Sequence, residues 1–241
     1  MLNYDYFKSR YRLAPFSYLC SPCITKKTRM IHIQQFTFNS FMVNTYLLYD
    51  ETGECVVVDA ACFDEPEKQM LADFLADHKL KLVRNINTHC HVDHVLGNDF
   101  IDRDYGIKPE YHKASIPFFH VAREFGQSFG YNIEQIPEPA GFLADGDEVI
   151  FGNSALTVFY TPGHAEGHLC FYNKKQGFVI TGDVLFRETI GRTDLPSGDF
   201  DLLMKSIRTR LFTLPDDTVV YPGHGPETTI GYEKVNNPFI R

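Results

Sequence analysis

Apolar residues in this chain recur in short runs, several of which alternate with polar residues at the period of two that is typical of β-strands. The first half contains four such runs, at residues 31–38, 42–49, 54–60 and 80–87. Asn39 and Ser40 separate the first two runs and predict a hairpin turn between them. Residues 65–79 instead repeat apolar positions at helical spacing, which predicts a helix covering one face of a sheet.

The second half of the chain repeats this arrangement. Strands are predicted at residues 108–111, 147–151, 155–160, 168–172, 177–183 and 218–225. Helices are predicted at residues 113–129 and 200–211. Two strand-rich halves, each followed by helices, predict an α/β (α+β) fold, an αββα sandwich of two mixed β-sheets flanked by helices. Because no long linker interrupts the pattern, residues 30–241 are expected to form a single domain.

Residues 1–29 differ from the rest of the chain, since they are rich in tyrosine, basic and nearly free of acidic residues. The first clean strand pattern opens at Met30, so we interpret residues 1–29 as an N-terminal extension of uncertain role. A transit peptide is the weaker alternative, because a helix in this segment would be poorly amphipathic.

Composition narrows the classes of function. The formal net charge of −8 over 241 residues argues against a nucleic-acid partner, whose phosphates require a basic surface. The longest apolar runs are far shorter than a membrane span, so no membrane association is expected. Six cysteines are scattered through a chain without a secretory signal, which indicates reduced thiols and a cytoplasmic location. The Cys20–Cys23 spacing suits redox chemistry or zinc, but two incidental thiols are the favoured interpretation.

The densest chemical motif is Thr-His-Cys-His-Val-Asp-His at residues 88–94, directly after the apolar run at 80–87. In extended backbone His89 and His91 point the same way, because side chains alternate with period two. They can therefore bind one ion while Asp93 and His94 turn towards a second. Neutral imidazole and carboxylate are ligands that zinc and iron accept. The motif therefore predicts a metal site in a loop at the end of a strand.

Three further strand ends carry a potential ligand: His164, Asp183 and His224. Both histidines occur in Pro-Gly-His, where proline fixes the turn and glycine lets the backbone pass close to an ion. Two other residues have open roles. Asp59 could support the metal loop or cap a turn, and His168 could orient a ligand or pack within a sheet.

The motif His-x-His-x-Asp-His after a buried strand resembles the signature of the metallo-β-lactamase superfamily. The resemblance implies that fold and two divalent metal ions, zinc first, with iron or manganese as alternatives. It also implies a hydroxide between the ions as nucleophile, oriented by Asp93 as a catalytic residue. The implied ligands fall into one triad, a second triad and a bridging carboxylate: His89, His91 and His164; Asp93, His94 and His224; and Asp183.

The strand-end motifs resemble the glyoxalase II branch, the hydroxyacylglutathione hydrolases, and most closely its short bacterial forms. The resemblance implies cleavage of a small, anionic thioester by a metal-dependent hydrolase. It also implies that Arg192 contacts the substrate carboxylate, the alternative being a surface salt bridge with Asp194 or Asp199. The chain departs from the family at Gly225-Pro226, where a tyrosine is common, and it ends without the helical extension that carries further glutathione-binding residues.

Other activities stay open. A persulfide dioxygenase with one iron shares the Thr-His-Cys-His-x-Asp-His and Gly-Arg-Thr-Asp motifs and is the main alternative. A lactonase, a β-lactamase and a non-catalytic metal-binding protein fit less well. The aromatic residues within 118–143 could form a flap or subunit contact near the site, but core packing is the commoner fate of phenylalanine and is our expectation.

Overall fold

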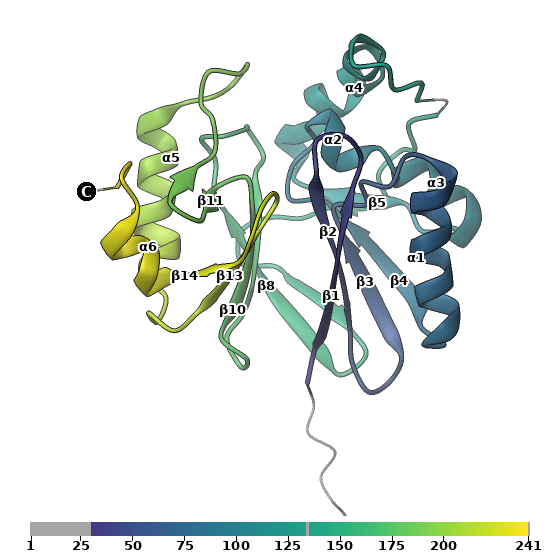
Figure 1. The fold of residues 1–241 in the computed structure, drawn as a ribbon, viewed down its shortest axis with the longest axis horizontal. Helices are drawn as coiled ribbons and strands as arrows, with labels where there is room; N and C mark the ends of the chain where they lie inside the picture. Colours follow the sequence, from purple (N-terminus) through teal and green to yellow (C-terminus); the bar gives the residue numbers. More distant parts are fainter. Residues whose placement is uncertain (1–29, 134, 241) are drawn as a thin grey trace, which may run out of the picture.

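The computed structural model describes residues 30–133 and 135–240 and arranges them in four layers, helix, sheet, sheet, helix (Figure 1). Helices α1 (Glu65–Asp77) and α3 (Asn98–Tyr105) cover one outer face, and α5 (Phe200–Ser206) and α6 (Ile230–Asn236) cover the other. The predicted αββα sandwich is therefore confirmed. The N-terminal extension and the Cys20–Cys23 pair lie outside the described residues.

The first sheet is built from the N-terminal half and mixes both strand orientations. Its spatial order is β1 (His32–Phe38), β2 (Val43–Tyr49), β3 (Glu54–Val58), β4 (Lys81–Ile86), β5 (Pro109–Tyr111) and β6 (Gly141–Phe142). The pairs from β1 to β3 are antiparallel, whereas those from β3 to β6 are parallel. The parallel step from β3 to β4 requires a crossover, and α1 supplies it.

The second sheet is built from the C-terminal half and is mostly antiparallel. Its spatial order is β14 (Thr228–Thr229), β13 (Val219–Pro222), β10 (Phe178–Gly182), β9 (Leu169–Asn173), β8 (Ser154–Tyr160) and β7 (Glu148–Phe151). Only β10 and β13 pair in parallel. The remaining elements are α2 (Val92–Val95), α4 (Ile116–Ser128), the ribbon of β11 (Leu185–Phe186) and β12 (Thr189–Ile190), a 3₁₀ turn (Lys113–Ser115) and a π turn (Ile207–Leu211).

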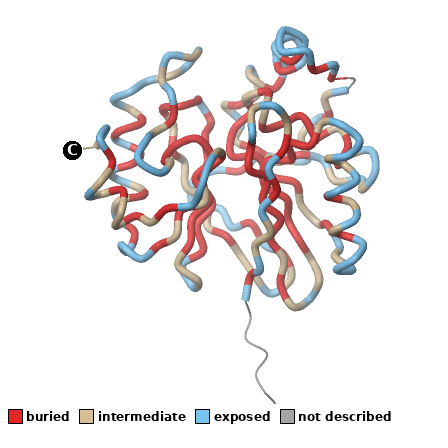
Figure 2. The backbone as a smooth tube through the Cα atoms, in the orientation of Figure 1, coloured by how far each residue is buried: buried red, intermediate tan, exposed pale blue. Residues whose placement is uncertain are grey.

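The period of two in the strands explains how both faces of each sheet become buried. In β3, Val56 and Val58 point into the core between the sheets, while Cys55 and Val57 pack under the outer helices. In β10, Ile180 faces the core between the sheets from the opposite side. In Figure 2 the residues of both sheets are mostly buried, whereas exposed residues are frequent on the outer helices. Apolar burial on both faces of the strands therefore holds the four layers together.

The predicted elements differ from the observed ones mainly at their ends and in short pieces. The helix predicted at 113–129 begins as a 3₁₀ turn, and the one at 200–211 ends in a π turn. The sequence does not predict the two-residue strands β6, β11, β12 and β14, because a strand of two residues has no measurable periodicity.

Two bulk features can be compared with the structure. Among the described residues, no helix combines the length and the apolar character needed to cross a lipid bilayer. The four cysteines in the described part of the chain are free and buried: Cys55, Cys62, Cys90 and Cys170.

The topology brings four strand ends to one edge of the sandwich. Strands β8, β10 and β13 run in the same direction, since β8 and β10 are both antiparallel to β9 and β13 is parallel to β10. Their carboxyl ends therefore meet at one edge of the second sheet. The carboxyl end of β4 reaches the same edge from the first sheet, where the Leu169 amide donates to the Thr88 carbonyl oxygen at 2.7 Å.

The core between the sheets should dominate the stability of the fold. Leu48 is 0% exposed and packs in that core, so Leu48→Ala should lower the free energy of unfolding by about 2–5 kcal/mol. Urea unfolding followed by circular dichroism measures this change. Met70→Ala, on the outer face of α1 at 55% exposure, is the matched control and should change the value by less than about 0.5 kcal/mol. Equal losses in the two variants would contradict this assignment of the core.

Candidate metal centre

Seven histidine and aspartate side chains converge at the edge where the four strand ends meet. They come from the loop after β4, from α2, and from the loops after β8, β10 and β13: His89, His91, Asp93, His94, His164, Asp183 and His224. Within the described residues they form three overlapping groups in which the potential ligand atoms lie within 4.8 Å of one another. The structure therefore brings together all seven residues of the implied ligand set.

The first group consists of three imidazoles. His91 Nδ1 lies 3.1 Å from His89 Nε2 and 3.0 Å from His164 Nε2. Zinc–nitrogen bonds of about 2.0–2.1 Å at tetrahedral angles place two ligand nitrogens roughly 3.3 Å apart. The three nitrogens are thus spaced as ligands of one ion would be.

The second group surrounds the carboxylate of Asp93. Its Oδ2 atom lies 3.6 Å from His94 Nε2 and 3.5 Å from His224 Nε2. The Asp183 carboxylate lies between the two groups, with Oδ1 3.5 Å from His94 Nε2 and Oδ2 3.6 Å from the Nε2 atoms of His164 and His224. Asp183 is therefore placed where a carboxylate could serve both groups.

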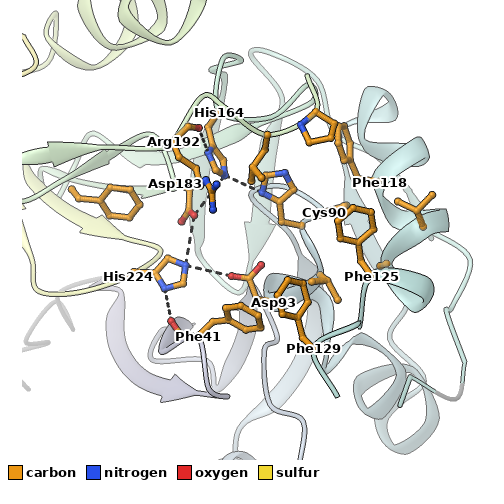
Figure 3. Close-up of a pocket in the computed structure, with 17 residues that line it drawn as sticks. Phe41, Cys90, Asp93, Phe118, Phe125, Phe129, His164, Asp183, Arg192 and His224 are labelled. Carbon is orange, nitrogen blue, oxygen red and sulfur yellow. Dashed lines mark hydrogen bonds and ion pairs between the residues drawn. The ribbon is translucent and has the colours of Figure 1, made fainter. Parts of the chain in front are cut away.

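The outward-facing nitrogens of three of these histidines fix which tautomer each ring adopts. His164 Nδ1 lies 2.8 Å from the Arg192 carbonyl oxygen, and His224 Nδ1 lies 3.0 Å from that of Phe41 (Figure 3). His94 Nδ1 lies 3.0 Å from Asp59 Oδ2. Carbonyl and carboxylate oxygens only accept hydrogen bonds, so these Nδ1 atoms donate, and each ring in its neutral form directs its Nε2 lone pair inward.

Burial and charge show what the cluster needs at its centre. His94 Nε2 and Asp183 Oδ1 are buried and have no hydrogen-bond partner within the described residues. Burial lowers the pKa of His94, but the nearby carboxylates, Asp183 first, outweigh burial and raise that pKa well above its ordinary value. The position therefore attracts positive charge strongly. Inward lone pairs, orphaned buried acceptors and negative potential together fit divalent cations.

The imidazoles of the first group are held neutral, which metal binding requires. Burial lowers the pKa of His91 to about 4 and also lowers the pKa values of His89 and His164. Neutral rings keep a lone pair available for a metal at pH 7, without competition from protons.

Asp59 supports this centre from behind. Its Oδ1 atom accepts from the Thr88 amide at 2.7 Å, and Oδ2 accepts from the Thr88 hydroxyl at 2.7 Å and from His94 Nδ1. Of the two roles that the sequence left open, support of the metal loop is the one that the structure shows. Asp59 is 1% exposed, so these hydrogen bonds take the place of water around its carboxylate.

His168 also acts through a neighbour. Its Nε2 atom accepts from the Asp183 backbone amide at 3.1 Å, and its ring stacks on that of His89 with the centroids 4.8 Å apart. His168 thus fixes the backbone from which the Asp183 carboxylate projects, and it belongs to none of the three potential ligand groups.

The two Pro-Gly-His turns use their glycines differently. A Cβ atom on Gly223 would lie 2.2 Å from Asp183 Oδ1 and 2.9 Å from His94 Cε1, so this glycine leaves room for the cluster. A Cβ atom on Gly163, where φ is +133°, would instead lie 2.2 Å from the Leu203 backbone nitrogen. The expected close approach to an ion therefore describes Gly223, whereas Gly163 allows close packing against α5.

A pocket of about 450 Å³ opens beside the cluster. Phe119 and Tyr131 are buried as expected for core aromatics. That expectation is wrong for Phe125 and Phe129, which are 50% and 56% exposed and line the pocket. The helical spacing of apolar residues over 113–129 does not reveal this difference, because it cannot tell a face that packs from a face that lines a pocket.

Arg192 also lines the pocket, but its side chain is already paired. The guanidinium donates to both carboxylate oxygens of Asp194, at 2.8 and 2.7 Å, and is 60% exposed. The ion pair that the sequence offered as an alternative is therefore present, and contact with a substrate stays a prediction. The backbone carbonyl of Arg192 has a separate role, because it accepts from His164.

Removing the carboxylate charge at position 183 should prevent the binding of a second ion. The variant Asp183→Asn should bind at most one divalent ion per chain, because the residue between the two groups loses its charge. Elemental analysis after dialysis against zinc measures the number of ions bound. Asp194→Asn, outside the cluster, is the control and should match the unmodified chain. Full stoichiometry and affinity in the Asp183→Asn variant would exclude the bridging role.

Weakening the support behind the cluster should lower affinity without removing a ligand. The variant Asp59→Asn should bind zinc about 10- to 100-fold more weakly, because partners of ligand histidines fix their orientation. Competition with a chromophoric chelator measures the affinity. Asp64→Asn changes the N-cap of α1 to another good cap and should leave zinc affinity unchanged. An unaltered affinity in Asp59→Asn would show that the hydrogen bonds from Asp59 do not support the site.

Comparison with known proteins identifies the family of this site. A family model described as the metallo-beta-lactamase superfamily matches residues 39–224. A hydroxyacylglutathione hydrolase, GloC, from Haemophilus influenzae is 32% identical over 212 residues, which cover 87% of this chain and 98% of the relative.

Solved structures extend the comparison. A protein crystallised in a di-iron-bound form, TTHA1623, is 34% identical with a TM-score of 0.77, covering 86% of this chain and 99% of that one. ETHE1 from Myxococcus xanthus is 28% identical with a TM-score of 0.69, covering 86% and 83% respectively. Because the family model matches residues 39–224, this chain belongs to the metallo-β-lactamase superfamily.

Proposed function

We propose that this protein is a metal-dependent thioesterase of the glyoxalase II type. Membership of a metallo-hydrolase superfamily and the cluster of seven ligand side chains support an enzyme that binds divalent ions. The relative from Haemophilus influenzae named hydroxyacylglutathione hydrolase supports the thioester. The choice of a thioester rests on one observation, namely which residue types line the pocket beside the cluster.

Apart from the cluster, the described residues that line this pocket include no lysine, tyrosine or glutamate that could act as a general acid. Cys90 is buried, and burial raises the pKa of its thiol well above the ordinary value. A thiol has a pKa of roughly 8–9, so a thiolate can leave without being protonated. The nitrogen of an amide cannot leave unless it is protonated. The pocket therefore suits thioesters better than amides.

The chain's own groups have defined tasks in this reaction. Divalent ions, when bound, activate water and polarise a carbonyl oxygen as Lewis acids. Asp93 lines the pocket, and burial would raise its pKa, but His94 and His224 outweigh burial and hold that pKa below its ordinary range. Asp93 is therefore an ionised carboxylate that can orient a water molecule by accepting its hydrogen bond. His164 and His224 are held by backbone carbonyls and keep their rings fixed.

Two features limit how closely the chain follows glyoxalase II. Gly225-Pro226 stands where a tyrosine is common in that family, and the Arg192 side chain is paired with Asp194. A carboxylate of glutathione would have to compete with Asp194 for the Arg192 guanidinium. Thioester hydrolysis is therefore the proposal, with glutathione as one carrier to test and zinc, iron and manganese as the metals to compare.

A persulfide dioxygenase is the second candidate, and one group in the cluster favours it. His89, His94 and Asp183 form a two-histidine, one-carboxylate set, which is the ligand set of many mononuclear iron oxygenases. An oxygenase would work with one iron and consume oxygen, whereas a thioesterase would release a thiol without oxygen.

Thiol release tests the proposal. Metal-free protein is loaded separately with zinc, manganese and iron, and release of thiol from S-lactoylglutathione and from S-acyl N-acetylcysteamines is followed with a thiol reagent. We expect turnover with at least one thioester and one metal, and loss of turnover when the metal is chelated. Asp93→Asn should lower kcat by about 100-fold or more, the scale of general acid–base contributions.

The control is oxygen consumption with glutathione persulfide under the same metal loadings. Oxygen uptake by the iron-loaded protein, without release of thiol from any thioester, would replace the thioesterase by the dioxygenase. Turnover that survives both metal chelation and Asp93→Asn would remove the metal centre from the reaction.

A further inference from the structure

The pocket beside the metal centre has an aromatic and aliphatic wall that catalysis at the metal does not require. Its apolar lining comes from α2, from α4 and the residue that follows it, from the β1–β2 turn and from the segments after β10, and it includes Phe41, Phe118, Val121, Phe125 and Phe129. A volume of about 450 Å³ lies within the range of small-molecule sites. The apolar wall is therefore a candidate binding surface for part of the substrate.

Helix α4 presents two adjoining apolar faces, one packed on the core and the other lining the pocket. Phe119 is buried in the cluster of apolar residues beneath the helix, and Ala122 lies where the two faces meet, because it belongs to that cluster and also lines the pocket. Phe118, Val121 and Phe125 are spaced three and four positions apart, so they form a stripe on another face, and Phe129 continues it. All four line the pocket, and Val121, Phe125 and Phe129 are exposed. Exposed aromatic residues gathered at a pocket indicate a ligand surface.

The stripe runs alongside the metal centre. Phe118 makes an edge contact with the ring of His91, with the centroids 5.6 Å apart. At the other end Phe129 contacts Phe41 from the β1–β2 turn, at 5.2 Å between centroids. Figure 3 shows Phe118, Phe125 and Phe129 on the α4 side of the pocket, with Asp183 and His224 across from them. Because Phe41 also accepts a hydrogen bond from His224 Nδ1, a group bound along the stripe would lie beside the metal ligands.

The charges at this wall indicate what kind of group it binds. Among the described lining residues, Arg192 is the one charged side chain outside the metal cluster, and Asp194 already pairs with it. Cellular thiol carriers are polar and charged, so the apolar part of a thioester is its acyl group. A wall without unpaired charge therefore matches the acyl group better than the carrier.

We propose that the α4 stripe binds an apolar acyl chain, so that the physiological substrates are thioesters of medium-chain or aromatic acids rather than of small hydroxy acids. This inference rests on the proposed thioesterase function and specifies its substrate class. Each methylene group buried against the stripe should raise kcat/KM about three- to fourfold, until the chain outgrows the pocket.

The test varies the acyl chain on a constant, uncharged carrier. S-Acetyl, S-butanoyl and S-octanoyl N-acetylcysteamine are compared at saturating metal. We expect kcat/KM to be at least about 50-fold higher for octanoyl than for acetyl, the gain from burying roughly three of the six additional methylene groups. Phe125→Ala should reduce this ratio by about tenfold, and Phe125→Leu should restore most of it, because an aliphatic wall keeps the apolar contact.

The matched control is Phe239→Ala. Phe239 is 49% exposed and does not line the pocket, so this variant should keep the ratio of the unmodified chain. A second readout avoids turnover altogether: calorimetric binding of S-octyl and S-methyl N-acetylcysteamine, two thioethers that cannot be hydrolysed. The S-octyl compound should bind more tightly. Phe125→Ala should weaken the binding of the S-octyl compound and leave the binding of the S-methyl compound unchanged.

The outcomes separate this inference from the proposed function. Hydrolysis of acetyl and octanoyl thioesters with equal kcat/KM would overturn the acyl-chain site and leave the thioesterase intact. Tight binding of the S-octyl thioether, weakened by Phe125→Ala, without hydrolysis of any thioester would support the apolar site and overturn the thioesterase. A ratio that Phe239→Ala changes as much as Phe125→Ala does would overturn the assignment to the α4 stripe.

Discussion

The metal centre is organised around buried polar atoms that make no hydrogen bond and that lie among carboxylates favouring positive charge. His94 Nε2 and Asp183 Oδ1 have no hydrogen-bond partner in the described part of the chain, and an unpaired buried polar atom costs about 1–3 kcal/mol. Backbone and carboxylate oxygens hold the opposite nitrogens of His94, His164 and His224, so these rings cannot turn away. Cations bound at the centre would remove this cost, and the fold keeps the site ready for them.

Contacts between the two sheets position these ligands. Asn44 in β2 donates its backbone amide to the Gly223 carbonyl oxygen at 2.7 Å, and the Tyr46 hydroxyl donates to the Pro222 carbonyl oxygen at 2.6 Å. The β13 end that carries His224 is thereby tied to the first sheet. Both sheets also pack against a common apolar core. The spacing between ligands from different halves of the chain is therefore set by packing between the sheets, away from the metal centre.

The layers could be predicted from a local pattern, the period of two in the strands. The short motifs at strand ends led to the ligand set through the family resemblance that they carry, and the structure brings those seven side chains together. The sequence left Asp59 and His168 open, because their partners His94 and Asp183 lie 35 and 15 residues away and only the fold joins them. It misjudged Phe125 and Phe129 for the same reason. Periodicity shows that a helix has apolar faces, but the neighbours decide which face is covered.

Anomalous diffraction from zinc-loaded crystals tests the metal centre most directly. Two peaks are expected at the edge of the sandwich, one among His89, His91 and His164 and the other among Asp93, His94 and His224, with Asp183 between them. Peaks that lie elsewhere on the chain, with these side chains unchanged and without an ion, would contradict a metal centre at the strand ends and the hydrolase proposed from it.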